Sequence, residues 1–423
     1  MNQEVITHIV NEFNTPIYIY DGEKIEHQYK LLKSCLPKHF EVFYSVKANP
    51  LLGVCQLFKK LGSQIEVASL AELQTAFQAG FTPDQIIFTS PGKTIEELET
   101  SIDRQIYSIN VESLEEAILI NHIGQKKGRQ VPISVRINPD FNLSGAGLRM
   151  TGVPTQFGID QSQLEEALGT IQSLPYLKLI GLHIYTGSQM LAASLIIKNM
   201  EEIIKLAITV SETYAFPLQF LDLGGGFGIP YFTGEQYLDM DELGKGLQTV
   251  WETYAHKLEG TRIGVESGRF LMAESGLFVT KVLYVKESKG TKYVVCDGGS
   301  NHHASSAFLG RHIRNNFPMH VHSQEEQDEL TEVTVVGSLC TPTDVIGQKV
   351  KLGKVDSGDY IVVEKSGAYG LTHSPVLFLS HQLPAEVLYK QGQVHVLRER
   401  GSVEDFFKGQ KLLSTHEELL QRT

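Results

Sequence analysis

One lysine stands where an apolar segment of the sequence ends. Lys47 closes the run EVFYSVKA, inside the longer segment YSVKAN. Partial burial lowers the pKa of a lysine and makes its amine a nucleophile that can form a Schiff base. A lysine in such a place can equally extend its amine into solvent, so the segment by itself leaves both interpretations open.

Two later segments could bind a charged ligand. Residues 224–228 read GGGFG, and the bare N–H groups of three successive glycines would let a phosphate approach the backbone closely. Residues 266–269 read ESGR, which places Glu266 three residues before Arg269. Each segment also has a plainer interpretation, since a glycine run is more often a turn and two opposite charges more often form a surface ion pair.

A further segment, HIYTGSQ, contains a histidine, a tyrosine and a serine. His183 and Tyr185 lie two residues apart, so in a strand they would point to the same side. Ser188 adds a hydroxyl group close by. For His183 we favour a buried ring whose nitrogen atoms are satisfied by hydrogen bonds.

The elements that would position these residues are eight near-continuous apolar runs, typical of strands buried on both faces. Helix-like segments separate them, and several begin with Ser or Thr, carry an acid in the first turn and end on Gly. The pattern predicts a (β/α)8 TIM barrel between about residues 30 and 270. An open doubly wound sheet is the alternative, but no GxGxxG follows the first strand. The predicted strands are 41–48, 63–69, 86–91, 106–111, 133–139, 179–186, 220–226 and 262–269.

After about residue 272 the pattern changes to short apolar or alternating runs separated by Gly, Asp and Ser turns. This change predicts an antiparallel β domain after the barrel. The segment PIYIYD precedes the barrel and could pair into the same domain. We therefore expect an N-terminal segment at 1–28, a barrel at 29–272 and a β domain at 273–423. The chemically promising segments then lie at the C-terminal ends of barrel strands, where barrel enzymes work.

Composition excludes several classes of protein. The 423 residues include 37 Lys and Arg against 49 Asp and Glu, a formal charge of −12 that argues against nucleic acid as a partner. No apolar run approaches the about 18 residues that span a bilayer, and the first residues do not read as a signal peptide. The four cysteines form no CxxC pair, so we expect neither disulfides nor a metal site, and a cytoplasmic location.

Five motifs, taken together and in this order, resemble the fold-type III family of pyridoxal-phosphate-dependent decarboxylases. That family contains diaminopimelate, ornithine and arginine decarboxylases and shares its fold with alanine racemase. YSVKAN resembles the segment of the cofactor lysine, GGGFG the phosphate cradle, and ESGR the family's EPGR. In the β domain, CTPTD resembles a segment of cysteine, acid, two residues and Asp, and SGAYG resembles the GAY motif. The likeness covers essentially the whole chain and implies an alanine racemase-like architecture with pyridoxal 5'-phosphate as cofactor.

The resemblance also implies roles. Lys47 would hold the cofactor as a Schiff base, Glu266 would face the pyridine nitrogen and keep it protonated, Arg269 would bind phosphate or a substrate carboxylate, and Tyr369 would touch the phosphate. Cys340 would come from the partner subunit of a homodimer and donate a proton to Cα after carbon dioxide leaves. Racemases carry an arginine opposite the pyridine nitrogen, so Glu266 favours a decarboxylase. The implied cofactor-binding residues are Lys47, Tyr185, Ser188, Gly224, Gly225, Gly226, Glu266, Gly268, Arg269 and Tyr369.

Two positions depart from the family pattern. The decarboxylases stack a histidine of HxGS on the cofactor ring, whereas this chain has Tyr185 at that position and His183 two residues earlier. Tyrosine can supply a stacking face but no positive charge. In the family, an acidic residue follows the cysteine and holds the distal ammonium of the substrate. In this chain Thr341 stands at that position. A buried ammonium without its carboxylate is unfavourable, which argues against diaminopimelate, ornithine or lysine unless another acid such as Asp344 replaces the lost one.

A subgroup of the family has the same threonine. TGVPTQFGID, DGGSNHHA and GAYGLTHSPVLFLSH resemble the decarboxylase of butirosin biosynthesis, which acts on glutamate thioesterified to an acyl carrier protein, and relatives encoded with exopolysaccharide–exosortase systems. We therefore expect a carrier-bound, glutamate-like substrate contacted by Arg269 and Thr341. Arg311 and Arg314 could receive the carrier's phosphate or be solvated surface charges. Diaminopimelate decarboxylase, a racemase and a non-catalytic regulator are the alternatives.

Overall fold

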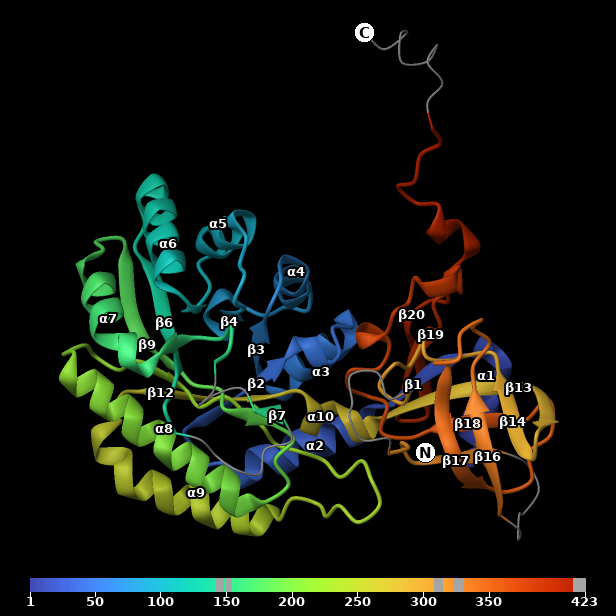
Figure 1. Cartoon of the computed structure of the whole chain (residues 1–423). Coiled ribbons are helices and arrows are strands. Elements are labelled where there is room, and N and C mark those ends of the chain that lie inside the picture. Colours follow the sequence, from blue (N-terminus) through green and yellow to red (C-terminus); the bar gives the residue numbers. More distant parts are fainter. Residues whose placement is uncertain (142–147, 150–153, 308–314, 323–329, 414–423) are drawn as a thin grey trace, which may run out of the picture.

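Eight parallel strands close into a barrel that forms one half of the molecule (Figure 1). The computed structural model describes residues 1–141, 148–149, 154–307, 315–322 and 330–413. The strand order is β5–β4–β3–β2–β12–β11–β9–β6, and β5 pairs with β6 to close the ring. All eight predicted strands and the TIM barrel are confirmed. Their bounds are β2 (Phe40–Ser45), β3 (Gln64–Val67), β4 (Ile86–Thr89), β5 (Ser108–Val111), β6 (Val131–Asn138), β9 (Leu177–His183), β11 (Phe220–Asp222) and β12 (Arg262–Ser267).

Packed side chains fill the barrel below the C-terminal ends of its strands. Phe43, Ile87, Ile180 and Phe220 form a buried cluster contributed by four different strands. Gly264 leaves room for this layer, because a Cβ there would lie 2.9 Å from the ring of Phe43. The interior is therefore a packed core and not a channel, and barrels of this kind bind their ligands at the end where the strands finish.

Helices surround the barrel, and their caps follow the predicted signals. Ser69, Thr94 and Ser113 each accept a hydrogen bond from a backbone N–H in the first turn of the helix that follows, an interaction that stabilises a helix by about 1 kcal/mol. Gly62 and Gly128 end two of the helices in the left-handed conformation. The helices are α2 (Gly22–Cys35), α3 (Leu52–Leu61), α4 (Leu70–Gln78), α5 (Ile95–Arg104), α6 (Leu114–Lys127), α7 (Leu164–Ser173), α8 (Ala193–Thr213), α9 (Met240–Tyr254) and α10 (Arg269–Met272).

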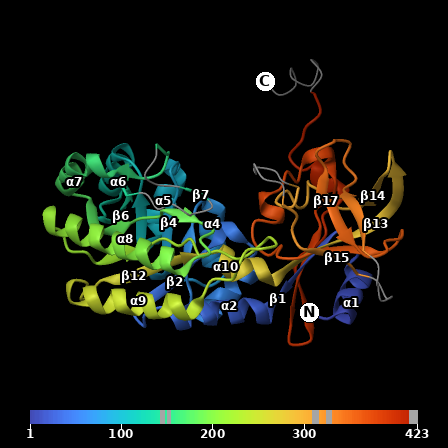
Figure 2. The same cartoon turned by 60° about the horizontal axis from the view of Figure 1, so that its bottom comes forward.

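A second, nine-stranded sheet lies beside the barrel, with α1 (Gln3–Phe13) packed against it (Figure 2). Its central path is β17–β16–β14–β13–β1–β19–β20, and β18 pairs with β13 and β15. The segment PIYIYD contributes β1 to this sheet, between β13 and β19. The strands are β1 (Ile17–Asp21), β13 (Gly276–Ser288), β14 (Thr291–Cys296), β15 (Met319–His322), β16 (Thr331–Val336), β17 (Val345–Leu352), β18 (Tyr360–Val363), β19 (Ala385–Lys390) and β20 (Gln393–Arg398).

The sheet differs from a purely antiparallel one in two places. β1 runs parallel to β19, and β14 runs parallel to β16, whereas the other pairings are antiparallel. A parallel pair needs a long crossover between its strands. The whole barrel and strands β13 to β18 lie between β1 and β19 in the chain, and together they provide that connection. The limits proposed for the three parts, 1–28, 29–272 and 273–423, stay a prediction.

The two halves meet beside the mouth of the barrel. The N–H of Tyr369 donates to the carbonyl oxygen of Ala48 at 2.8 Å, and Asn49 Nδ2 donates to the carbonyl oxygen of Gly367 at 3.2 Å. The SGAYG segment of the β domain is therefore fastened to the YSVKAN segment of the barrel. Among the described helices, none combines the length and the apolar character needed to cross a bilayer.

Candidate active site

Lys47 lies at the barrel mouth, in a single 3-10 turn (Val46–Ala48) that follows β2. Its side chain is 43% exposed, and its Nζ lies 3.4 Å from Glu66 Oε1 and 5.6 Å from the centroid of the Tyr185 ring. Glu66 comes from β3, the strand beside β2. The amine is therefore held between a carboxylate and an aromatic ring at the mouth.

Neighbouring carboxylates set the charge state of Lys47. Burial alone would lower its pKa, but the carboxylates of Glu66 and Glu266 outweigh burial, and the net effect raises the pKa above its ordinary value. Of the two interpretations that the sequence left open, a depressed pKa does not apply to the protein without cofactor, in which Lys47 is an ammonium ion. Its proton has to leave before the amine can act as a nucleophile, and Glu66 Oε1 is the adjacent acceptor.

The glycine run forms a turn after β11 that only glycine allows. Gly224 and Gly226 have φ angles of 62° and 102°, and a Cβ on Gly225 would lie 2.1 Å from the carbonyl oxygen of Glu266. The N–H groups of Gly225 and Gly226 donate to no other group in the described part of the chain. Two adjacent free N–H groups at the mouth could bind an anion such as phosphate.

The ESGR segment lies at the end of β12, which pairs with β2 on the edge away from β3, the strand that carries Glu66. Glu266 is buried at the end of β12, and Gly268 precedes α10. Arg269 Nη1 donates to the Tyr231 hydroxyl at 3.3 Å, and its guanidinium carbon lies 4.7 Å from the centroid of the Tyr369 ring. A Cβ on Gly268 would lie 2.7 Å from that of Ala48, so glycine lets this turn lie against the Lys47 segment.

Tyr185 lies against the glycine turn, since a Cβ on Gly224 would come within 2.9 Å of its ring. Burial raises the pKa of Tyr185 to about 12, so its hydroxyl stays protonated. Ser188 follows in β10 (Gly187–Ser188), which pairs with β7 (Leu148–Arg149). The ring beside Lys47 is thus that of Tyr185, whereas His183 is completely buried.

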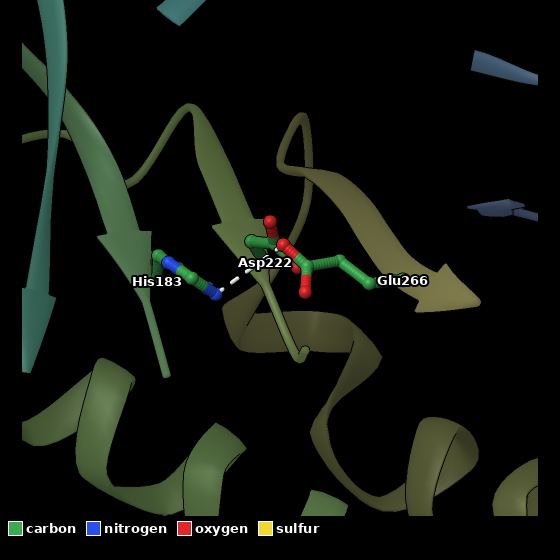
Figure 3. Close-up of side chains that lie close together, drawn as sticks. All are labelled: His183, Asp222 and Glu266. Carbon is green, nitrogen blue, oxygen red and sulfur yellow. Dashed lines mark ion pairs between the residues drawn. The ribbon is translucent and has the colours of Figure 1, made fainter. Parts of the chain in front are cut away.

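His183 belongs to a buried group that the sequence did not reveal. His183, Asp222 and Glu266 end the neighbouring strands β9, β11 and β12, and their polar atoms lie within 4.8 Å of one another (Figure 3). His183 Nε2 faces Glu266 Oε1 at 3.4 Å. Neither ring nitrogen of His183 makes a hydrogen bond with any described group, so the prediction of a satisfied histidine is wrong.

Other charged residues at strand ends were also missed. Glu112 follows β5 and Arg136 lies in β6, where Arg136 Nη1 donates to both carboxylate oxygens of Glu112, at 2.9 and 3.0 Å. The available signal was a single charged residue inside each otherwise apolar run, as in SQIEVAS, ISVRINP and FLDLGGG. Such a residue at the end of a barrel strand points to the mouth.

Cys340 and Thr341 lie in the loop between β16 and β17, and Cys340 is exposed. Asp344 holds this loop: its carboxylate accepts the N–H of Ser300 at 2.6 Å and the N–H of Leu339 at 2.8 Å. Asp344 is 3% exposed. It is therefore engaged by the backbone and is not free to replace the missing acid beside Cys340. Arg311 and Arg314 lie outside the described residues.

The residues at the mouth fit pyridoxal phosphate. The site offers an amine, free glycine N–H groups and the guanidinium of Arg269, whose buried Nε lacks a partner among the described residues. Glu266 Oε1 is likewise buried without a hydrogen bond from any described group. These groups match an aldehyde, a phosphate and a pyridine nitrogen in kind. A bound cofactor would satisfy polar atoms that are otherwise costly to bury.

Comparison with known proteins agrees with this chemistry. Residues 22–273 match the family "Pyridoxal-dependent decarboxylase, pyridoxal binding domain". The chain is 40% identical to the L-glutamyl-[BtrI acyl-carrier protein] decarboxylase of Niallia circulans over 99% of both chains. It is 31% identical to the diaminopimelate decarboxylase of Campylobacter jejuni over 93% of this chain and 95% of that one. The structure of diaminopimelate decarboxylase from M. jannaschii with L-lysine superposes with a TM-score of 0.89 at 27% identity, covering 96% of this chain and 94% of that one. The chain therefore belongs to the family of pyridoxal-dependent decarboxylases and is a carboxy-lyase that uses pyridoxal phosphate.

Proposed function

We propose that this enzyme removes the α-carboxylate of an L-glutamate-like amino acid whose far end is a thioester to an acyl carrier protein. The observation that carries the proposal is the pair Thr341 and Asp344. A threonine stands beside Cys340, and the nearby carboxylate is already engaged by two backbone N–H groups. A substrate with a neutral far end needs no acid there. The chain is 40% identical, over 99% of both chains, to a decarboxylase named for a glutamyl carrier protein, and this similarity supports the same choice.

The residues at the mouth divide the work. Lys47 would bind the cofactor covalently, the Gly224–Gly226 turn with Arg269 and Tyr369 would hold its phosphate, and Glu266 would hold the proton on its pyridine nitrogen. When bound, pyridoxal phosphate supplies the ring that accepts the electrons released by decarboxylation. Tyr185 would cover the ring face and exclude water. Glu266 favours this reaction over racemisation, because a carboxylate favours the protonated, electron-accepting ring.

Cys340 would serve the site of a second subunit. It is exposed on the β domain, and the hydrogen bond that the carboxylate of Asp344 accepts from the N–H of Ser300 holds its loop to another part of that domain. In a homodimer it would deliver a proton to the substrate Cα of the partner's site. The four cysteines are free in this structure, as a reducing compartment would leave them, and we place the enzyme in the cytoplasm.

The substrate is tested by carbon dioxide release. The holoenzyme is given glutamyl-loaded carrier protein, free L-glutamate, meso-diaminopimelate, L-lysine and L-ornithine. We expect the loaded carrier to be used best, and the diamino acids to be slower by on the order of a hundredfold or more, because their distal ammonium lacks a carboxylate. Thr341→Glu should raise kcat/KM for the diamino acids, whereas Thr343→Glu, two residues away on the same exposed loop, should not. Rapid decarboxylation of meso-diaminopimelate by the unaltered enzyme would reject the proposal in favour of diaminopimelate decarboxylase.

The shared site is tested by mixing two inactive variants. Lys47→Ala chains keep Cys340, and Cys340→Ala chains keep Lys47, so a mixed dimer contains one intact site. Random exchange of subunits makes half of the dimers mixed, and about a quarter of the unaltered specific activity should return. Each variant alone is the control, and mass spectrometry of tagged chains verifies exchange. Verified exchange without recovery would contradict a shared site.

A further inference from the structure

The buried group at the ends of β9, β11 and β12 contains two carboxylates and one imidazole. Asp222 Oδ1 accepts the N–H of Gly224 at 2.9 Å, which fixes the carboxylate. Asp222 Oδ2, Glu266 Oε1 and both nitrogens of His183 make no hydrogen bond with other described residues. Figure 3 shows the imidazole of His183 and the carboxylate of Glu266 directed toward each other, with Asp222 beside them. Four polar atoms without partners, all buried and close together, require an explanation.

No cation of the described residues is left to neutralise these two acids. The three cations that act on the group are each already paired with another carboxylate. Those pairs are Lys47 with Glu66 at 3.4 Å, Lys93 with Glu116 at 2.7 Å, and Arg136 with Glu112 at 2.9 Å. Two bare carboxylates a few ångströms apart in a buried site repel strongly, so one of them has to hold a proton.

The direction of the pKa shifts agrees with this geometry. Burial, together with Glu66, raises the pKa of both Asp222 and Glu266, and Asp222 raises the pKa of Glu266 further. Burial, with Arg136, Lys47 and Lys93 nearby, lowers the pKa of His183, so its ring is neutral. A neutral ring with its hydrogen on Nε2 can donate to Glu266 Oε1, and a protonated carboxyl can donate to its neighbour.

We propose that Asp222 and His183 are positioning residues that share one proton with Glu266 and so keep it as a single, oriented anion. This inference rests on the proposed place of Glu266 opposite the pyridine nitrogen. Asp222 and His183 would touch neither substrate nor cofactor. They would fix the orientation of the Glu266 carboxylate. They would also prevent Asp222 and Glu266 from being negatively charged at the same time.

Stability as a function of pH tests the shared proton directly, without cofactor. Above about pH 4 the unfolded chain has lost this proton, whereas the native protein still holds it. The free energy of unfolding therefore falls as pH rises, until the native group ionises too. One such proton changes the unfolding equilibrium constant about tenfold per pH unit. Asp222→Asn keeps the acceptor for Gly224 and a donor toward Glu266, yet removes the ionisable acid. Denaturant unfolding of the full chain between pH 5 and 7, values chosen to lie above the unfolded carboxyl pKa, should show this dependence reduced by about one proton in the variant.

The matched control is Glu386→Gln in the β domain. Glu386 is equally buried but is hydrogen-bonded to Tyr20 and Arg398, so the variant controls for the loss of a buried carboxylate outside the group. If Asp222→Asn does not fold, Glu266→Gln replaces it, because sharing needs both acids. An unchanged pH dependence in the folded variant would overturn the inference. A divalent metal ion bound stoichiometrically at the three residues, measured by elemental analysis, would overturn it as well.

A second readout separates this inference from the proposed role of Glu266. The visible absorption of bound cofactor is titrated with pH in the unaltered enzyme, in Asp222→Asn and in Glu386→Gln. If Glu266 lies opposite the pyridine nitrogen, loss of the shared proton should change the spectrum, and Asp222→Asn alone should remove that step. A stability effect without a spectral step would leave the shared proton standing and contradict the proposed place of Glu266.

Discussion

Replacing Lys47 by alanine is expected to abolish the visible absorption band of bound cofactor and to reduce decarboxylation by orders of magnitude. The amine of Lys47 is the one proposed to bind the cofactor covalently, and alanine cannot form that bond. Reduction of the unaltered holoenzyme with borohydride, followed by peptide mass spectrometry, should place the cofactor on the peptide that contains Lys47. The same treatment of Lys47→Ala should label no peptide.

The control for this variant is Lys60→Ala. Lys60 is an exposed lysine on α3, only a short distance along the chain. Its removal should leave spectrum, labelling and rate as they are. A Lys47→Ala enzyme with an ordinary spectrum and rate, or borohydride labelling of another lysine, would refute the assignment.

Glu266→Gln is expected to slow decarboxylation by on the order of 10² or more, the usual scale for losing a strong electrostatic partner of the reacting group. Glutamine has nearly the same shape but no charge, so it cannot hold a proton on the pyridine nitrogen. The dissociation constant of the cofactor should change less, since the phosphate and Lys47 contacts remain. The measurements are kcat at saturating cofactor and a spectral titration of cofactor binding.

Glu386→Gln again provides the control, because it removes a buried carboxylate whose hydrogen-bond partners, Tyr20 and Arg398, have no proposed role at the site. An unchanged kcat in Glu266→Gln would mean that the acid opposite the pyridine nitrogen lies elsewhere. Equal losses in rate and cofactor affinity would instead indicate that Glu266 mainly holds the cofactor in place.

The barrel could be predicted because its signals are local. Each strand is a short apolar run, and caps such as Ser69 and Thr94 need only the next three residues to act. The pairing of β1 with β19 could not be predicted in this way, since its two strands are separated by almost the whole chain. The β propensity of the residues indicates which segments form strands, but long-range packing decides which strands become neighbours.

The site shows the same division. Lys47 and the glycine turn could be identified from their segments and their place at strand ends. The pKa direction of Lys47 could not, because the charge that reverses it arrives from Glu66 on the neighbouring strand. The unsatisfied ring of His183 likewise depends on Asp222 and Glu266, which are distant in sequence and adjacent only once the barrel has closed. Asp344 looked available for a substrate until its two backbone donors were known.

The position of β1 has a consequence for biosynthesis. This strand precedes the barrel in the chain, yet it is the middle of the second sheet, between β13 and β19. During translation β1 leaves the ribosome before the barrel does. Its backbone N–H and C=O groups therefore stay unpaired while the barrel is synthesised. Unpaired strand edges promote aggregation, so this interval is the vulnerable period in the life of the nascent chain. β1 gains its second neighbour only when β19 leaves the ribosome, and a stalled or truncated product lacking that strand would expose one edge of β1 and become a target for chaperones and proteases.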